Sequence, residues 1–164
     1  MTGPVVVLIG PMGAGKTRIG RSVAKQLDVG FLDTDKMVVA EHGPIADIFD
    51  SAGEAAFREL EREAVVRAMA SDGVVSLGGG AVLNADTAAD LEERRVVLLT
   101  VSAEAVAARL ASGTRPLVRG GIADWQRITD ARMPLYTRLA GVTFDTSRIP
   151  TSRIAEEVAR WLRT

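Results

Sequence analysis

Short apolar segments alternate along this chain with longer stretches in which apolar residues recur every three or four positions. The first segment, Val5 to Ile9, is continuously apolar, as is typical of a parallel strand covered on both faces. Four further short strands are predicted at 31–32, 74–77, 96–101 and 142–144. Polar residues or glycines follow several of these strands: the second ends at Asp33, the third at three glycines and the fifth at Asp145.

Helices are predicted between the strands. In the stretch from Lys16 to Leu27, apolar residues lie at spacings of four, and residues 54–69 and 154–162 carry comparable apolar stripes. A further helix is expected over 103–110, with Ser102 as its N-cap. This alternation predicts one α/β domain over residues 1–164, with three layers and a parallel sheet.

Residues 111–121 interrupt the alternation. They read ASGTRPLVRGG, which is too polar for a core element, and their glycines could act as the hinges of a mobile loop. A plain surface connection is the alternative.

Composition narrows the function classes. The chain has 164 residues, 47% of them apolar and 25% charged, which suits one globular domain. The net charge of −1 argues against a general binder of nucleic acids or membrane surfaces. Of the 20 basic residues all but three are Arg, which grips planar anions well and is also common in proteins of GC-rich genomes.

The chain has no Cys and only one His, which limits the chemistry open to it. There is no Cys, which excludes disulfides, thiolate nucleophiles and Cys-ligated zinc. The single His42 gives little support to a His-rich metal site or a Ser-His triad, and we expect it at a helix end or on the surface. We see no signal peptide and no apolar run long enough to span a bilayer, so a soluble cytoplasmic protein is expected.

The strongest chemical signal is the loop from Gly10 to Thr17. It reads GPMGAGKT, fits G-x-x-x-x-G-K-[ST], and lies between an apolar strand and an amphipathic helix. Gly13 and Gly15 permit backbone angles that let successive N–H groups converge on phosphate oxygens. Lys16 can reach the β- and γ-phosphates, and the Thr17 hydroxyl can bind Mg²⁺. The loop therefore predicts a site for a nucleoside triphosphate.

The loop leaves the reaction open. The chain is short for a GTPase and lacks an N-K-x-D guanine signature, and it is also short for a motor or transporter ATPase. A small-molecule kinase is the natural size class.

A second substrate is expected at the carboxyl ends of the strands, where open α/β sheets bind ligands. Asp33 and Asp35 could divide the work there, one holding the Mg²⁺ shell and the other accepting a proton from a hydroxyl; a turn with solvated acids is the alternative. The three glycines at 78–80 suit close approach of a ligand, or only a tight turn. Arg58 and Arg132 would suit an acceptor carrying a carboxylate, or lie on the surface.

Together these residues resemble one family, the shikimate kinases, over nearly the whole chain. Beside the GPMGAGKT loop, the resemblance rests on seven further segments: FLDTD at 31–35, IADIF at 45–49, the Gly-Glu…Phe-Arg run at 53–58, SLGGGAV at 76–82, TRPL at 114–117, MPLY at 133–136 and DTSR at 145–148. The first motif is shared by many NTPases, but the ordered combination is highly specific. It implies a nucleoside-monophosphate-kinase-like fold with a five-stranded parallel sheet in the order 2-3-1-4-5 and a lid at about 111–121.

The resemblance also implies an activity, namely transfer of the ATP γ-phosphoryl group to the 3-hydroxyl of shikimate, with Mg²⁺ as cofactor. It further leads us to expect a monomer located in the cytoplasm. Asp35 would hold shikimate hydroxyls within an acceptor-binding region at about 35–62. Arg58 and Arg132 would bind the carboxylate, and the pocket would be completed by Phe49, Phe57, Gly78, Gly79 and Gly80.

On the nucleotide side, the resemblance implies contacts from Met12, Gly13, Ala14, Gly15, Lys16 and Thr17. Asp33 would join Thr17 in the Mg²⁺ shell. Arg115 would reach the phosphates from the lid, and Arg109 and Arg148 would lie near adenine. The arginines would make the cleft locally cationic.

The sequence departs from the family pattern at two places. The segment between Asp35 and Ile45 is one residue shorter than is common, with Pro44 where Ser or Thr is frequent, and Arg148 is followed by Ile149 rather than a second Arg. Two other functions compete: a kinase of another small acceptor, such as gluconate or a nucleotide, and a non-catalytic ATP-binding module. The acceptor residues argue against the first, and the presence of Lys16, Asp35 and Arg115 against the second.

Overall fold

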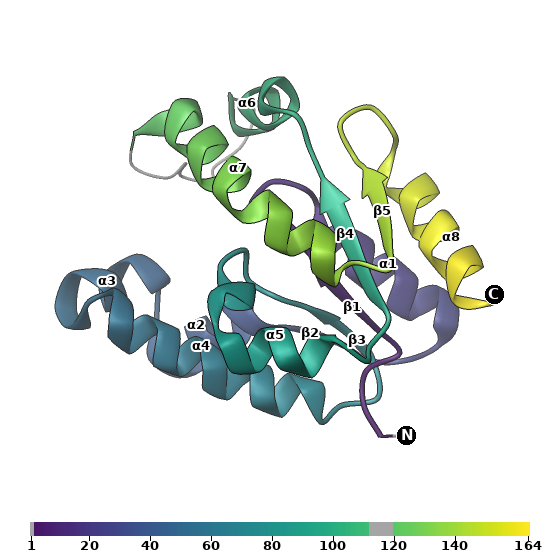
Figure 1. Ribbon diagram of the computed structural model, residues 1–164, viewed down its shortest axis with the longest axis horizontal. Coiled ribbons are helices and arrows are strands. Elements are labelled where there is room, and N and C mark those ends of the chain that lie inside the picture. The colour runs from purple at the N-terminus through teal and green to yellow at the C-terminus, as the bar shows by residue number, and fades with distance from the viewer. Residues whose placement is uncertain (1, 112–119) are drawn as a thin grey trace.

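Five strands form one parallel sheet in the order β2-β3-β1-β4-β5 (Figure 1). The computed structural model describes residues 2–111 and 120–164. The strands are β1 (Val6–Ile9), β2 (Phe31–Asp33), β3 (Val74–Ser76), β4 (Val96–Thr100) and β5 (Val142–Asp145). In the register, Val7 of the central β1 lies between Val75 and Val96. The sheet order expected from the family resemblance is thus confirmed, and the strand ends differ from prediction by only a residue or two.

Helices follow or precede every strand. They are α1 (Lys16–Leu27), α2 (Thr34–His42), α3 (Ile45–Ala52), α4 (Glu54–Met69), α5 (Ala85–Leu91), α6 (Ala103–Ala111), α7 (Gly121–Leu139) and α8 (Thr151–Leu162), with a short 3₁₀ turn at Ala81–Leu83. Ser102 caps α6 as predicted, because its Oγ accepts from the Ala105 N–H at 3.1 Å. His42 is the last residue of α2 and is exposed.

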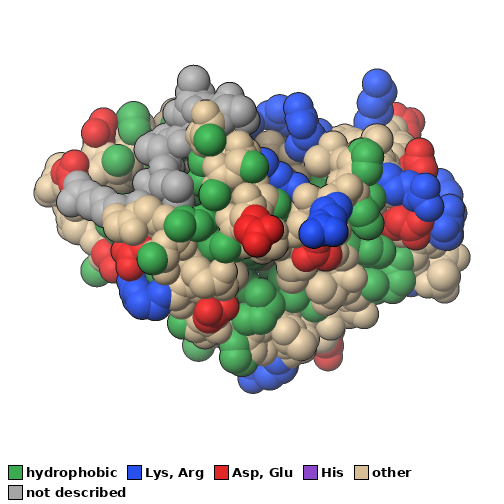
Figure 2. Space-filling view, turned by 90° about the horizontal axis from the view of Figure 1, so that it is seen from above, with side chains coloured by type: hydrophobic (Ala, Val, Ile, Leu, Met, Phe, Trp, Pro, Cys, Tyr) green, Lys and Arg blue, Asp and Glu red, His purple; other side chains and the backbone are tan. Residues whose placement is uncertain are grey.

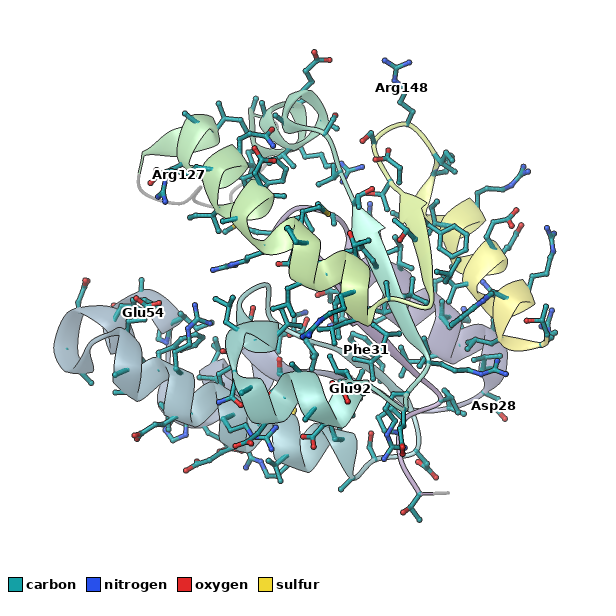
Figure 3. The ribbon with its side chains drawn as sticks, viewed as in Figure 1. Asp28, Phe31, Glu54, Glu92, Arg127 and Arg148 are labelled. Atoms are coloured by element: carbon teal, nitrogen blue, oxygen red, sulfur yellow. The ribbon has the colours of Figure 1, made fainter. Side chains whose placement is uncertain are left out.

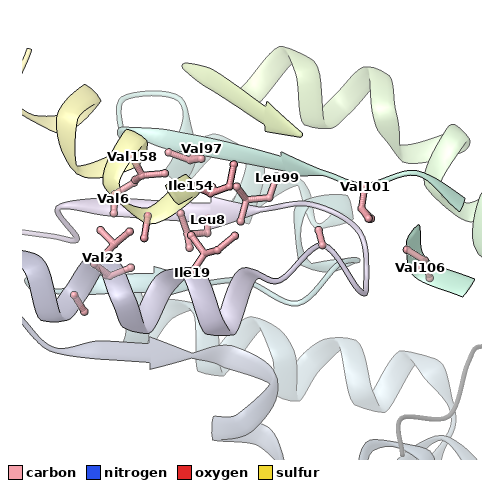
Figure 4. Packing of buried hydrophobic residues seen from close by; sticks show 14 of the residues in the cluster. Val6, Leu8, Ile19, Val23, Val97, Leu99, Val101, Val106, Ile154 and Val158 are labelled. Carbon is pink, nitrogen blue, oxygen red and sulfur yellow. The ribbon is translucent and has the colours of Figure 1, made fainter. Parts of the chain in front are cut away.

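Alternate residues of each central strand face opposite helical layers. Val6 and Leu8 pack with Ile19 of α1 and Ile154 of α8 on one face (Figure 4). Val7 and Ile9 pack on the other face in a second core cluster, to which α4, α5 and α7 contribute. Burial on both faces explains why β1 reads as an uninterrupted apolar run, and it completes the predicted three-layer architecture.

Helices α2, α3 and α4 form a separate block at one end of the sheet (Figure 1). A third, smaller apolar cluster holds it together, with Val38, Ile48 and Phe57 as members. Gly43 ends α2 and Gly53 ends α3, with φ angles of 85° and 89°, a region that residues with a side chain rarely adopt. The block projects beyond the carboxyl ends of the strands, so it forms one wall of any site at that edge.

None of the helices in the described ranges is both long enough and apolar enough to cross a membrane. Seen from the side of α6 and α7, the surface mixes basic, acidic and apolar side chains (Figure 2).

Candidate active site

A cavity of about 690 Å³ lies at the carboxyl ends of the strands. Its lining comes from the loop after β1, the start of α2, the helices α3 and α4, the loop after β3, and α7. The cavity brings together thirteen of the residues predicted from sequence: Met12, Gly13, Gly15, Lys16, Thr17, Asp33, Asp35, Phe49, Phe57, Arg58, Gly79, Gly80 and Arg132. The predicted nucleotide and acceptor sides therefore share one space.

The glycine-rich loop after β1 has the backbone that the sequence predicted. Gly13 and Gly15 have φ angles of 86° and 90°, and Gly15 is the N-cap of α1. The positive end of the α1 dipole thus faces the cavity beside Lys16. The Lys16 ammonium donates to the carbonyl oxygens of Gly10 and Pro11 at 2.7 and 2.9 Å, so it is held over the loop that a phosphate would occupy.

Thr17 and Asp33 meet across the cavity floor, although they belong to different elements. The Thr17 hydroxyl donates to Asp33 Oδ2 at 2.5 Å, while Asp33 Oδ1 accepts from the Lys36 N–H at 3.1 Å and caps α2. A hydroxyl and a carboxylate oxygen are donors of the kind that Mg²⁺ prefers. Within the described residues, no three or more His, Cys, Asp or Glu side chains are grouped so that they could hold a metal ion. A metal ion at this pair would therefore take further ligands from water and phosphate.

Asp35 is the carboxylate that we expect on the acceptor side, and it lines the cavity. Burial and the neighbouring Asp33 raise its pKa, while Lys16 and Arg58 partly offset the rise. A second carboxyl group, Glu61, is 4% exposed, and burial raises its pKa as well, against the opposing effect of its hydrogen bond with Arg58. Gly78 lies between the two: a Cβ there would be 2.4 Å from Asp35 Oδ1 and 3.1 Å from Glu61 Oε2.

Arg58 is fixed in the cavity wall by several contacts. Its Nη1 donates to Glu61 Oε1 at 2.8 Å, and Nη2 lies 3.5 Å from Glu54 Oε1. Its guanidinium lies 5.3 Å from the Phe57 ring centroid and packs so close to Gly80 that a Cβ there would clash with it. The Phe57 ring in turn lies 5.1 Å from that of Phe49. The glycine thus gives the guanidinium access to the loop after β3.

Arg132 approaches the same loop from α7. A Cβ on Gly79 would lie 3.4 Å from Arg132 Nη1. Tyr136, one turn further along the helix, donates from its hydroxyl to the Gly79 carbonyl at 2.5 Å. Burial raises the pKa of Tyr136, and the nearby Arg132 limits the rise. Two guanidinium groups therefore flank one glycine turn, an arrangement that suits a carboxylate.

Other predicted residues lie away from the cavity lining. Ala14 belongs to the phosphate loop but is fully buried, and Gly78 packs behind Asp35. Arg109 donates to the Gly13 carbonyl at 2.5 Å and to the Thr146 carbonyl, so it braces the loop from outside. Figure 3 shows Arg148 projecting from the β5–α8 connection, far from Glu54 at the start of α4. Arg148 borders a separate pocket with Ile149 and Pro150.

The lid expected at 111–121 and its Arg115 fall largely on residues 112–119, outside the described residues. The cationic cleft expected from sequence is more balanced in the part that the structure describes. The basic lining residues are Lys16, Arg18, Lys36, Arg58 and Arg132, and the acidic ones are Asp33, Asp35, Glu54 and Glu61.

Among the lining residues that the sequence analysis did not assign to the site, three make hydrogen bonds that shape it. Glu61 sits in a charged helical run that reads as solvent-exposed, although its i,i+3 spacing from Arg58 was a usable signal. Tyr136 was quoted only as part of MPLY, and its spacing of four from Arg132 places the two on one helix face. Trp125, whose indole N–H donates to the Met12 carbonyl at 2.8 Å, had no sequence signal linking it to the loop.

This fold and site define a P-loop domain of the small-molecule kinase class. The family model described as shikimate kinase matches residues 12–163. A shikimate kinase from Thermobifida fusca is 46% identical, the match covering 97% of this chain and 95% of that protein. One from Streptomyces coelicolor is 42% identical over 98% and 94% of the two chains. The chain therefore belongs to the shikimate kinase family, as the sequence motifs indicated.

Solved structures agree with this assignment. The shikimate kinase from Acinetobacter baumannii, in complex with shikimate, superposes with a TM-score of 0.89 at 30% identity, over 99% of this chain and 94% of that one. A sugar kinase from Janibacter superposes with a TM-score of 0.63 at 20% identity, a likeness of fold alone.

Proposed function

We propose that this protein transfers the γ-phosphoryl group of ATP to the 3-hydroxyl of shikimate. The observation that carries the proposal is the shared cavity, which has Lys16 and Thr17 on one side and Asp35, Arg58 and Arg132 on the other. One continuous cavity with a phosphate loop at one end and paired guanidinium groups at the other suits an acceptor with a carboxylate and hydroxyls.

In the proposed reaction, the acceptor oxygen forms a bond to the γ-phosphorus as the bond from phosphorus to the β–γ bridging oxygen breaks. Asp35 orients the hydroxyl and takes its proton; burial supports this role because it raises the pKa of this carboxylate and so strengthens it as a base. Lys16 and the N–H groups of the loop stabilise the negative charge on the phosphoryl group as it is transferred. Arg58 and Arg132 hold the carboxylate at the far end of the acceptor.

Thr17 and Asp33 would hold Mg²⁺, because their oxygens meet at 2.5 Å beside the phosphate loop. When bound, this ion neutralises charge on the β- and γ-phosphates. The roles of the 111–121 lid and of Arg115, and those of Arg109 and Arg148 near adenine, rest on the family resemblance. They belong to this proposal as expectations.

The proposal extends to a monomer that works in the cytoplasm without nucleic-acid or membrane partners. The cavity that holds Lys16, Asp35, Arg58 and Arg132 is lined by this chain, so none of these four roles requires a residue from a second subunit. ATP and an anionic acceptor are charged and do not cross a bilayer unaided. An enzyme that uses both is therefore expected in the compartment where they are made, which supports the cytoplasm. On the face that Figure 2 shows, the described basic side chains are interspersed with acidic and apolar ones and do not form one extended basic surface for a polyanion.

A coupled ADP-release assay tests the reaction, with shikimate, gluconate and CMP offered as separate acceptors. We expect release with shikimate alone, and phosphorus NMR should show a new phosphate monoester on the 3-oxygen. The Lys16→Met variant should remove the signal. Release with gluconate or CMP but not shikimate would assign the site to another acceptor, and nucleotide binding without any turnover would favour a non-catalytic module.

A further inference from the structure

Helix α7 touches both loops of the candidate site through the same kind of contact. Near its start, the Trp125 indole N–H donates to the Met12 carbonyl of the phosphate loop at 2.8 Å. Near its end, the Tyr136 hydroxyl donates to the Gly79 carbonyl of the loop after β3 at 2.5 Å. The two aromatic residues lie about three turns apart, and 3.6 residues per turn brings them to nearly the same face of the helix.

Both side chains are held firmly. Trp125 is 2% exposed and Tyr136 is fully buried. Arg132 lies between them in sequence and lines the cavity with them. A buried polar contact of this kind has few alternative geometries, since neither donor can turn to water. The face of α7 that carries these residues therefore holds the two loops in fixed positions.

Each contact determines the direction of the next N–H group. In a trans peptide the carbonyl of one residue and the N–H of the following residue point to opposite sides, and none of the described peptide bonds is cis. Fixing the Met12 carbonyl thus fixes the Gly13 N–H, and fixing the Gly79 carbonyl fixes the Gly80 N–H. Neither N–H has a hydrogen-bond partner among the described residues, and both glycines line the cavity.

We propose that Trp125 and Tyr136 are positioning residues that aim the Gly13 N–H at the nucleotide phosphates and the Gly80 N–H at the acceptor carboxylate. The Gly80 half rests on the proposed function, because it takes the acceptor to be shikimate. The Gly13 half requires only that a nucleotide binds. Neither aromatic side chain takes part in the chemical step.

The Trp125→Phe substitution removes the indole donor and keeps an aromatic ring. The loss of one buried hydrogen bond should weaken ADP binding about five- to tenfold by calorimetry and leave the shikimate KM within about twofold. Trp161→Phe is the matched control, because Trp161 packs against Gly141 and Arg95, away from the cavity. Unchanged ADP affinity in the Trp125 variant, or equal weakening in the control, would overturn this half.

The Tyr136→Phe substitution removes only the hydroxyl. We expect the shikimate KM to rise about five- to tenfold, with the ATP KM and kcat within about twofold. A purely structural role would lower the melting temperature and move both KM values together, and that result would overturn the second half.

Amide NMR of the wild-type protein supplies a test that needs no variant. ADP should shift the Gly13 N–H resonance downfield and shikimate the Gly80 resonance, as new hydrogen bonds form. If neither resonance moves on saturation, the positioning proposal is wrong. If ADP moves Gly13 and shikimate neither binds nor turns over, the proposed acceptor is wrong while the Trp125 half stands.

Discussion

Arg58 and Glu61 form an ion pair in the wall of the cavity, with Nη1 and Oε1 2.8 Å apart. Both side chains come from α4 at i,i+3 spacing, so the helix itself sets their geometry. The pair places a buried carboxylate behind the guanidinium that we assign to the acceptor. It therefore orients Arg58 and keeps the Glu61 carboxyl group where solvent barely reaches it.

Stability should depend on pH through Glu61. Burial raises its folded pKa above about 4.5, the ordinary glutamate value, so the folded state holds more protons between the two pKa values. The free energy of unfolding of the wild type, relative to Glu61→Gln, should fall as pH rises through that window. Urea unfolding of both proteins in steps from pH 4 to pH 8 measures the difference. A difference that stays constant or increases with pH would contradict the assignment.

Gly78 should not tolerate even a methyl group. Its Cβ would lie 2.4 Å from Asp35 Oδ1, so Gly78→Ala must displace that carboxylate. We expect a loss of about 1–3 kcal/mol in stability and a shikimate KM about tenfold higher. Gly30→Ala is the matched control, since a Cβ there meets open space. Thermal melts and steady-state kinetics of the two variants should separate clearly; similar values would mean that Asp35 is not held as the structure has it.

Arg132→Ala should affect one substrate selectively. Loss of a charge-assisted contact should raise the shikimate KM about 10- to 100-fold and leave the ATP KM nearly unchanged. Arg138, exposed on the same helix, supplies the control variant Arg138→Ala. Equal changes in both KM values would argue against a carboxylate contact.

Lys16→Met should abolish most activity without unfolding the protein. Its ammonium is held over the phosphate loop, and we expect kcat/KM for ATP to fall about 100-fold or more. Lys25→Met, exposed in the last turn of α1, should retain full activity. Substantial turnover by the Lys16 variant, with an unchanged melting temperature, would remove that residue from the phosphate site.

The Asp33→Asn variant tests the proposed metal site. Asn keeps the N-cap of α2 but loses the charge beside Thr17, so half-maximal activity should need about five- to tenfold more Mg²⁺. Activity measured against Mg²⁺ concentration checks this, with the exposed Asp47→Asn as control. An identical Mg²⁺ dependence in the wild type and Asp33→Asn would place the ion elsewhere.

Sequence patterns predicted α1 and α4 with their observed bounds, because each carries a regular apolar stripe against the sheet. They did not predict α7, whose Pro134 and mixed residues hide its buried face. The short α2 was missed for a related reason: its apolar residues 37–39 are consecutive and show no helical spacing. The helix is favoured instead by the packing of Val38 with Ile48 of α3 and Phe57 of α4.

The site divides in the same way. Its glycines, Lys16 and the strand-end acids could be predicted, because short sequence segments determine the geometry of the phosphate loop and the places where the strands end. Trp125 could not, since its role depends on which loop packs against it after folding. Glu61 offered only its i,i+3 spacing from Arg58, and the sequence does not show that Gly78 packs against it. Arg109 lies between these cases: it was expected near the nucleotide, and it contacts the phosphate loop through the Gly13 carbonyl.

The contact between Trp125 and Met12 has a practical consequence as well. The chain has two tryptophans. The second, Trp161, lies on the last helix and packs beside Gly141, which precedes β5. A Trp161→Phe protein would therefore carry Trp125 as its single tryptophan, at the edge of the cavity that we propose for the nucleotide. Its emission would follow nucleotide arrival in real time, without a label or a coupling enzyme.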